Sequence, residues 1–249
     1  MVIIEKLSKS FGNHLVLDEV SLKVEEAENL VVFGRSGTGK SVLLKCMVRL
    51  MQPNKGNVSI FGKDVMTLGI DELNDLRQQM GFLFQGAALY DSMSVRGNLD
   101  FPLIRHSNLT LKERESRIKD VLEKVSLEEA IDKMPADLSG GMKKRIGLAR
   151  AIITEPKLML YDEPTTGLDP ITAKEISKLI LDLQKELKMT SVIVTHDILC
   201  AKIIADRAVM LEDGKIQYTG DITELTTSKD PFLKNFFSDE LIEESGRKG

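Results

Sequence analysis

The residues most suited to chemistry form one glycine-rich stretch, Gly34-Arg35-Ser36-Gly37-Thr38-Gly39-Lys40-Ser41, directly after the apolar run 30–33. Glycines let a backbone bend so that successive N–H groups point at phosphate oxygens, and a lysine neutralises the charge of the β- and γ-phosphates. A serine hydroxyl at the end of such a loop can ligate Mg²⁺. Residues 41–51 are typical of a helix, whose N-terminus favours anions. The pattern predicts that residues 34–41 bind a nucleotide and that Ser41 also binds a metal.

Two acids end a second apolar run, because Asp162 and Glu163 follow residues 158–161. Proteins with such phosphate loops place an aspartate at Mg²⁺ from the end of a strand. A second acid beside the γ-phosphate can orient and deprotonate a water, a role worth about 10²–10⁴-fold in rate. Alone, the pair could equally be solvated carboxylates. Together with the glycine-rich loop, they predict a metal ligand at Asp162 and a general base at Glu163.

A third element is the sequence Ser139-Gly140-Gly141, which opens a helical run over residues 143–153. The serine and the two glycines make a second helix N-terminus suited to an anion. One γ-phosphate hardly needs two such termini from one subunit. We therefore expect this terminus to serve a nucleotide held by another copy of the chain.

Across nearly its whole length the chain resembles an ATP-binding-cassette (ABC) ATPase. The motifs that carry the resemblance are, in order, residues 34–41, Gln85, 138–142, Asp162-Glu163, Asp169 and His196. The resemblance implies ATP and Mg²⁺ as cofactors, ATP hydrolysis, and a homodimer in which Ser139, Gly140 and Gly141 close over the γ-phosphate of the partner's ATP. It also implies two membrane-spanning permease subunits as partners, and a peripheral location on the cytoplasmic face of the inner (plasma) membrane.

Individual roles follow from the resemblance. Phe11 matches the aromatic residue that stacks on adenine. The alternative interpretation is that Phe11 is an ordinary core residue of a hairpin. Gln85 matches the glutamine that contacts Mg²⁺ and the attacking water. Asp169 matches a residue of the loop that crosses the dimer interface, and it can also cap the helix that begins at Pro170. His196 matches the histidine that contacts the γ-phosphate.

Two features indicate which branch of the family the chain resembles. Met142 stands where most relatives carry glutamine, and the segment 84–95 accompanies it. Together they resemble the ATPase subunits of phospholipid transporters of the lipid-asymmetry-maintenance (Mla) type. Met142 could alternatively be a neutral substitution at a tolerant position. The alternative functions are an ATPase for another importer or exporter, and a soluble ABC ATPase that serves no transporter.

The pattern of apolar runs predicts an α/β fold, and the resemblance implies a P-loop NTPase (RecA-like) core with an antiparallel β subdomain and an inserted helical subdomain. We expect one nucleotide-binding domain over 1–249, with its core at 1–85 and 155–229, the helical subdomain at 86–154 and a tail at 230–249. A hairpin at the sheet edge is predicted within residues 1–24, and a helix over 111–125. The apolar face of the tail (Phe232, Leu233, Phe236, Phe237 and Leu241) could pack on its own domain or reach the paired ATPase.

Composition limits the function classes. The net charge is −4 at pH 7 and no basic tract stands out, which argues against binding of nucleic acid. Cys46 and Cys200 lie in apolar helical runs without a CxxC pair, so we expect buried free thiols. The N-terminus shows no secretion signal, and the longest uncharged stretch, residues 78–90, is well short of the ~20 residues that span a membrane. We therefore expect no direct membrane insertion.

Overall fold

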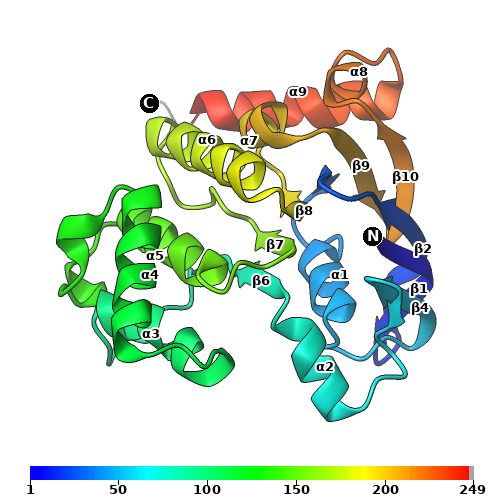
Figure 1. The fold of residues 1–249 in the computed structure, drawn as a ribbon. Helices are drawn as coiled ribbons and strands as arrows, with labels where there is room; N and C mark the ends of the chain where they lie inside the picture. Colours follow the sequence, from blue (N-terminus) through cyan, green and yellow to red (C-terminus); the bar gives the residue numbers. More distant parts are fainter. Residues whose placement is uncertain (247–249) are drawn as a thin grey trace. The chain divides into compact units, whose positions relative to one another are not determined.

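The chain folds into two compact units in a computed structural model that describes the backbone of residues 1–246 and the side chains of residues 1–238 (Figure 1). The first unit comprises Met1–Leu73 and Thr190–Gly249, and the second comprises Asn74–Met189. The second unit groups strands β6 (Met80–Leu83) and β7 (Leu158–Asp162) and helix α6 (Pro170–Leu187) with the helices that we predicted as an insertion. The predicted subdomain limits at residues 86 and 154 stay a prediction.

An antiparallel sheet in the order β2-β1-β4-β5 contains the predicted hairpin in the first unit. Its strands are β1 (Val2–Phe11), β2 (His14–Val24), β4 (Lys55–Ile60) and β5 (Lys63–Asp64). The pairing of Phe11 with His14 places the turn of the predicted hairpin at Gly12-Asn13. The expectation that the whole hairpin forms an edge is wrong for β1, because β4 pairs with its other side.

Parallel strands carry the nucleotide loop in the same unit. Strand β3 (Asn29–Phe33) lies between β8 (Thr190–Thr195) and β9 (Arg207–Glu212), and β10 (Lys215–Gly220) pairs antiparallel with β9. Every residue of β3 and β8 is buried, as expected for strands covered on both faces. The helices that follow β3 and β8 are α1 (Lys40–Met47) and α7 (Ile198–Ile204).

Helix α1 is shorter than the predicted segment 41–51. Arg49 takes a left-handed backbone conformation (φ 51°), which a continuing helix does not allow. Its guanidinium donates to the carbonyls of Val65 and Leu68, at 2.9 and 2.8 Å. These tertiary bonds end the helix near residue 47 although the apolar pattern continues.

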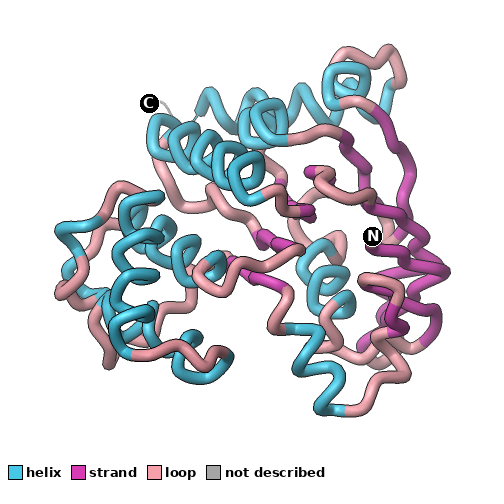
Figure 2. Tube along the Cα trace, in the orientation of Figure 1, coloured by secondary structure: helices cyan, strands magenta, loops and turns pink. Residues whose placement is uncertain are grey.

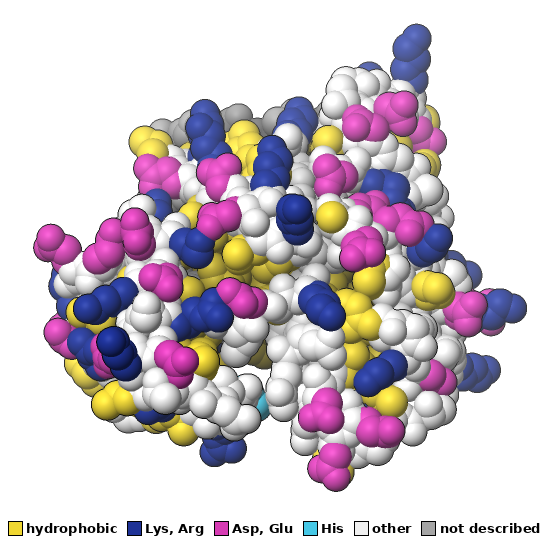
Figure 3. Space-filling model, in the orientation of Figure 1, with side chains coloured by type: hydrophobic (Ala, Val, Ile, Leu, Met, Phe, Trp, Pro, Cys, Tyr) yellow, Lys and Arg dark blue, Asp and Glu magenta, His cyan; other side chains and the backbone are white. Residues whose placement is uncertain are grey.

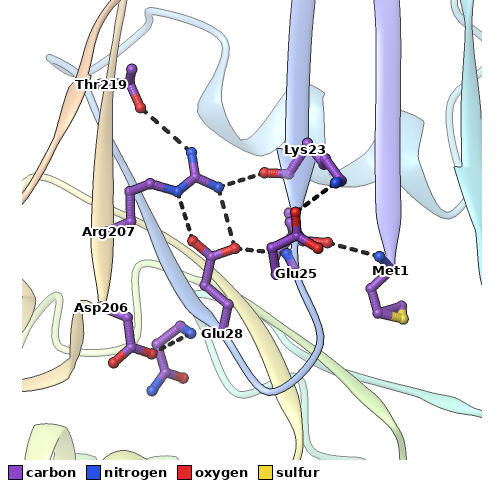
Figure 4. Close-up of polar contacts among 9 residues, drawn as sticks. Met1, Lys23, Glu25, Glu28, Asp206, Arg207 and Thr219 are labelled. Atoms are coloured by element: carbon purple, nitrogen blue, oxygen red, sulfur yellow. Dashed lines mark hydrogen bonds and ion pairs between the residues drawn. The ribbon is translucent and has the colours of Figure 1, made fainter.

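A cluster of polar contacts joins β2 to the parallel strands (Figure 4). The Arg207 guanidinium donates to both carboxylate oxygens of Glu28, at 2.7 and 3.2 Å, and to the Lys23 carbonyl at 2.5 Å. Asp206 accepts from the Asn29 N–H at 2.8 Å. The starts of β3 and β9 are thereby fixed to the end of β2.

The second unit is mostly helical (Figure 2). Its two strands, β6 (Met80–Leu83) and β7 (Leu158–Asp162), pair in parallel. Its helices are α3 (Val95–His106), α4 (Leu111–Lys124), α5 (Gly140–Ile152) and α6 (Pro170–Leu187), with short 3₁₀ turns at Glu128–Ala130 and Pro135–Asp137, and α2 (Ile70–Arg77) crosses the boundary between units. The predicted helix over 111–125 is confirmed, and Thr110 and Glu113 form a capping box at its start.

The C-terminal tail forms α9 (Pro231–Gly246) after the short α8 (Ile222–Thr226). Leu233, Phe236 and Phe237 are buried, and the rings of Phe236 and Phe237 meet the Phe33 ring edge-on, with centroids 6.4 and 5.6 Å away. This part of the tail therefore packs on its own chain. The side chain of Leu241 lies outside the described residues.

Cys46 and Cys200 are buried free cysteines, as predicted. Across the described residues, we find no helix with the length and apolar character needed to span a membrane. On the face drawn in Figure 3, Lys and Arg side chains are interspersed with Asp and Glu side chains.

Candidate nucleotide-binding and catalytic site

The glycine-rich loop connects β3 to α1 and depends on glycine at defined positions. Gly37 and Gly39 have φ of 86° and 99°, a region that other residues rarely adopt. A Cβ on Gly34 would lie 2.4 Å from the Leu211 carbonyl oxygen, so β9 approaches the loop too closely for a side chain. The sequence therefore folds here into the tight backbone curve that phosphate binding requires.

Lys40 points back into this curve. Its side chain is buried, and Nζ donates to the carbonyl oxygens of Gly34 at 2.5 Å and Arg35 at 3.0 Å. Glu212, at the end of β9, has a raised pKa because of burial and the nearby charge of Asp213, while Arg35 and Lys40 act in the opposite direction. The loop thus holds a buried cation at the start of a helix, an arrangement suited to an anionic phosphate.

His196 lies at the same end of the parallel strands as this loop. Phe33 pairs with Thr195, so Gly34 and His196 each follow directly after paired residues of adjacent strands. Asp197 then caps α7 by accepting from the Cys200 N–H at 2.9 Å. The first unit therefore brings the loop and the predicted γ-phosphate histidine together.

Phe11 lies at the hairpin turn with 48% of its surface exposed. The alternative of a buried hairpin residue is therefore wrong. The Lys9 ammonium lies 5.2 Å from the centroid of its ring. Stacking of Phe11 on adenine stays a prediction. His14 and His106 are exposed.

The second unit contains the acids and Gln85. Leu83 of β6 pairs with Tyr161 of β7, so Gln85 and Glu163 each follow two residues after paired positions, at the same edge of the strand pair. Asp162 and Glu163 are both buried. Glu163 has φ of 50°, an uncommon conformation for a residue with a side chain, and the Thr166 hydroxyl donates to its Oε2 at 3.2 Å. The residue that we predicted as the general base is thus fixed both at its backbone and at its carboxylate.

The serine and two glycines form the start of α5, as predicted. Ser139 is the N-cap, and its hydroxyl accepts from the Met142 N–H at 3.3 Å. A Cβ on Gly141 would lie 2.7 Å from Cγ2 of Thr172 on α6, so glycine permits this close approach.

Asp169 caps α6, confirming one of its two predicted roles. Its carboxylate accepts from the N–H groups of Ile171 and Thr172, at 3.1 and 3.0 Å, and from the Thr172 hydroxyl at 2.6 Å. These bonds lower the pKa of Asp169, and the bond from the Thr172 hydroxyl contributes most. Because Thr172 also borders Gly141, the Asp169 loop and the start of α5 are neighbours within one unit.

Sequence reasoning missed Lys144, one turn into α5. Its side chain is buried, and Nζ donates to the Glu163 carbonyl at 3.1 Å and to the Gln85 carbonyl. Burial lowers the pKa of Lys144, and the charges of Glu163 and Asp162 oppose that shift. A signal was present, because Lys144 shares a helix face with the apolar Leu148 and Ala151, at the spacing i, i+4, i+7.

The predicted metal site needs few protein ligands. Among the described residues, no three His, Cys, Asp or Glu side chains gather into a metal cluster. Magnesium bound with nucleotides is commonly held by one or two protein oxygens and by phosphate oxygens, which fits a set of Ser41, Gln85 and Asp162. Ser41 belongs to the first unit and the other two to the second, so this set stays a prediction.

Comparison with known proteins identifies a family. A family model described as ABC transporter matches residues 17–166. The chain is 37% identical to a probable ribonucleotide transport ATP-binding protein, mkl, of Mycobacterium leprae over 96% of its own length and 69% of the relative. It is 36% identical to the methionine import ATP-binding protein MetN of Clostridium tetani, over 97% of the chain and 76% of the relative. Against the Mycobacterium tuberculosis mkl protein the chain spans 66% of the relative's length.

Solved structures of ABC proteins have the same fold as this chain. The dimeric, post-hydrolysis structure of the ATP-binding cassette MJ0796 bound to ADP and Pi superposes with a TM-score of 0.82 at 32% identity, over 89% of this chain and 99% of that one. CbiO1 of Clostridium perfringens, part of the transporter complex cbiONQ, gives 0.84 at 28% identity, over 94% and 93%.

Proposed function

Because the chain belongs to the ABC transporter family and is an ATP hydrolase that uses Mg²⁺, we propose that two copies enclose ATP between them and drive two membrane-spanning partners. The observation that carries this proposal is the presence of two helix N-termini suited to phosphate in one chain, at Lys40 and at Gly140. The MJ0796 cassette, a relative by structure, is described as dimeric and bound to ADP and Pi. We place the assembly on the cytoplasmic face of the inner membrane, peripherally.

In this proposal the residues share the reaction as follows. Lys40 and Ser41 hold the β- and γ-phosphates and Mg²⁺, and the metal supplies charge stabilisation for the phosphoryl group. Asp162 is a further metal ligand, and Phe11 stacks on the base. Glu163 accepts the proton of the attacking water. The remaining assignments are Gln85 orienting that water, His196 contacting the γ-phosphate, Asp169 crossing the interface, and Ser139, Gly140 and Gly141 closing over the nucleotide of the other copy.

Mixed dimers test the shared site. Lys40→Ala removes the phosphate lysine, and Ser139→Arg places a bulky side chain at an exposed helix start. Each variant should be inactive alone. In a one-to-one mixture, half of the dimers combine one copy of each variant and contain one intact site, so about one quarter of wild-type activity should return. A mixture that stays inactive, with mixed dimers shown by mass spectrometry, contradicts the proposal.

Glu163→Gln tests the general base independently. The amide keeps the shape of the carboxylate but cannot take a proton, so turnover should fall by about 10²–10⁴-fold while ATP binding persists. The variant should accumulate as a closed dimer in gel filtration with ATP. A monomer under these conditions contradicts the enclosed-nucleotide mechanism.

We propose phospholipid as the transported substrate. Support comes from Met142 and the segment 84–95, which resemble the ATPases of Mla-type transporters. The partners would dock on the surface near residues 85–103, where Tyr90 and Ile104 are 45% and 59% exposed and the Tyr90 ring lies 5.1 Å from that of Phe101. Exposed apolar side chains of this kind mark interaction surfaces.

A second candidate is import of a small polar solute, because the relatives named above carry the words ribonucleotide transport and methionine import. The chain and its partners should be purified together from detergent-solubilised membranes and placed in liposomes. Stimulation of ATP hydrolysis by phospholipid composition supports the lipid proposal. Stimulation by methionine or a ribonucleotide, with its binding protein, contradicts that proposal and supports the second candidate.

A further inference from the structure

We propose that Lys144 is a positioning residue that fixes Gln85 and Glu163 to helix α5, so that the start of this helix and the reacting groups move together. The inference rests on the roles proposed above for Gln85 and Glu163. It concerns a residue outside the nucleotide loop and outside the Ser139-Gly140-Gly141 turn.

The contacts of the Lys144 side chain support this role. The side chain is 5% exposed, and its ammonium donates to the main-chain carbonyls of both Gln85 and Glu163. An ammonium group has three N–H donors and no acceptor, so one lysine can hold both carbonyls at once. The two residues belong to segments 78 positions apart in the chain, and α5 supplies the link between them.

Two further positions of α5 hold the loop after β6. A Cβ on Gly147 would lie 2.9 Å from the Ala87 Cβ, which shows how closely the helix and loop approach. The Arg150 guanidinium donates to the carbonyls of Ala88 at 2.7 Å and Ala87 at 3.0 Å. Positions 144, 147 and 150 are spaced by three and lie along one side of the helix. The loop 85–88 is therefore attached to α5 over two turns.

This attachment has a consequence for an enclosed nucleotide. Ser139, Gly140 and Gly141 begin α5 and, in the proposed dimer, contact the ATP of the other copy. Lys144 lies one turn further along the same helix, and it holds the general base and the water-orienting glutamine of its own copy. A shift of α5 on dimer closure would therefore change the position of both groups. Lys144 couples the two nucleotide sites.

Lys144→Met keeps an unbranched side chain that is one atom shorter, and it removes all donors. We expect kcat for ATP hydrolysis to fall by about 10- to 100-fold, because two carbonyls lose a charged donor and the reacting groups lose their fixed position. KM for ATP should stay within about threefold, since no phosphate contact is removed. The Hill coefficient for ATP should fall towards one. Lys144→Arg, which keeps a cationic donor, should recover most of the lost kcat.

Arg145→Met is the matched control. Arg145 is the adjacent cation of α5 and also bonds a backbone carbonyl, that of Val125 at 3.1 Å, and the Glu175 carboxylate at 3.0 Å. It contacts neither Gln85 nor Glu163 in these bonds. We expect its loss to lower the melting temperature while kcat and the Hill coefficient stay near wild type. Hydrogen exchange of residues 84–88 should increase in Lys144→Met and stay unchanged in Arg145→Met.

The inference is overturned if Lys144→Met keeps wild-type kcat, or if Arg145→Met loses kcat and cooperativity to the same extent. If Lys144→Met does not fold, Lys144→Gln replaces it, because the amide still donates one bond and should give an intermediate kcat. Gln85→Ala and Glu163→Gln are assayed in parallel. Full turnover in these two variants contradicts the proposed roles of the residues, whereas hydrogen exchange still reports whether Lys144 holds the loop.

Discussion

The loops at residues 34–39 and 85–88 both follow a parallel strand and both have irregular backbones, yet they are held differently. In the first loop, glycines at positive φ and a close approach of β9 fix the curve. In the second, Ala87 and Ala88 take positive φ, and side chains from α5 bond their carbonyls. A loop whose N–H groups must face phosphate is shaped by its own backbone. The loop that carries Gln85, the predicted water-orienting residue, is instead held by side chains of another element.

Gly39→Ala should disturb the first loop most. Gly39 has φ of 99°, and a Cβ there would lie 2.9 Å from Val16 Cγ1 and 3.0 Å from the Val16 carbonyl oxygen. The added methyl group combines backbone strain with a clash, so the free energy of unfolding should fall by about 2–4 kcal/mol. Denaturant unfolding without nucleotide measures this change.

Gly37→Ala is the control for strain alone. Gly37 has φ of 86°, but a Cβ there would meet no atom within 4 Å. Its substitution should cost about 1–2 kcal/mol. Equal losses for the two variants would show that close packing against β2 does not shape the loop.

Arg150→Met tests the second loop. Burial lowers the pKa of Arg150, and its guanidinium bonds two carbonyls of the loop. Loss of these charged donors should lower the free energy of unfolding by about 1.5–3 kcal/mol. Arg105→Met, which removes a cation 5.1 Å from the Phe101 ring at an exposed position, should cost about 0.5–1 kcal/mol. A loss at Arg150 no greater than at Arg105 would mean that α5 does not hold the loop through this cation.

The same difference explains what the sequence could predict. Gly34, Gly37 and Gly39 form a local pattern, and a local pattern gives both the position and the chemistry of the first loop. The helix 111–125 is equally local, because its start is marked by the Thr110 and Glu113 capping box and its face by regular apolar spacing. The fold class and the ends of β3 and β7 follow from the apolar runs at residues 30–33 and 158–161.

Long-range contacts were harder to predict. Lys144 bonds two carbonyls in segments that come together only through the pairing of β6 with β7. Because every residue has a main-chain carbonyl, the residue types do not show which carbonyls a lysine will bond. The early end of α1 depends on Arg49 reaching carbonyls of residues 65–68. The position of β1 inside its sheet depends on β4, which is more than forty residues away in the chain. In each case tertiary contacts changed what the local pattern favoured.

The smallest expected effect is on the chemical labelling of Cys46, which lies on α1, the helix that follows the first loop. Burial raises the pKa of this thiol to about 11, so at pH 8 roughly one molecule in a thousand carries the reactive thiolate. Iodoacetamide should therefore label Cys46 far more slowly in the folded protein than in the unfolded chain, and mass spectrometry of the Cys46 peptide measures the rate. Because labelling requires α1 to open, Gly39→Ala should accelerate it more than Arg150→Met, which acts on the other loop. Equal acceleration in both variants would show that the two loops are not held independently, and the contrast between them would fail.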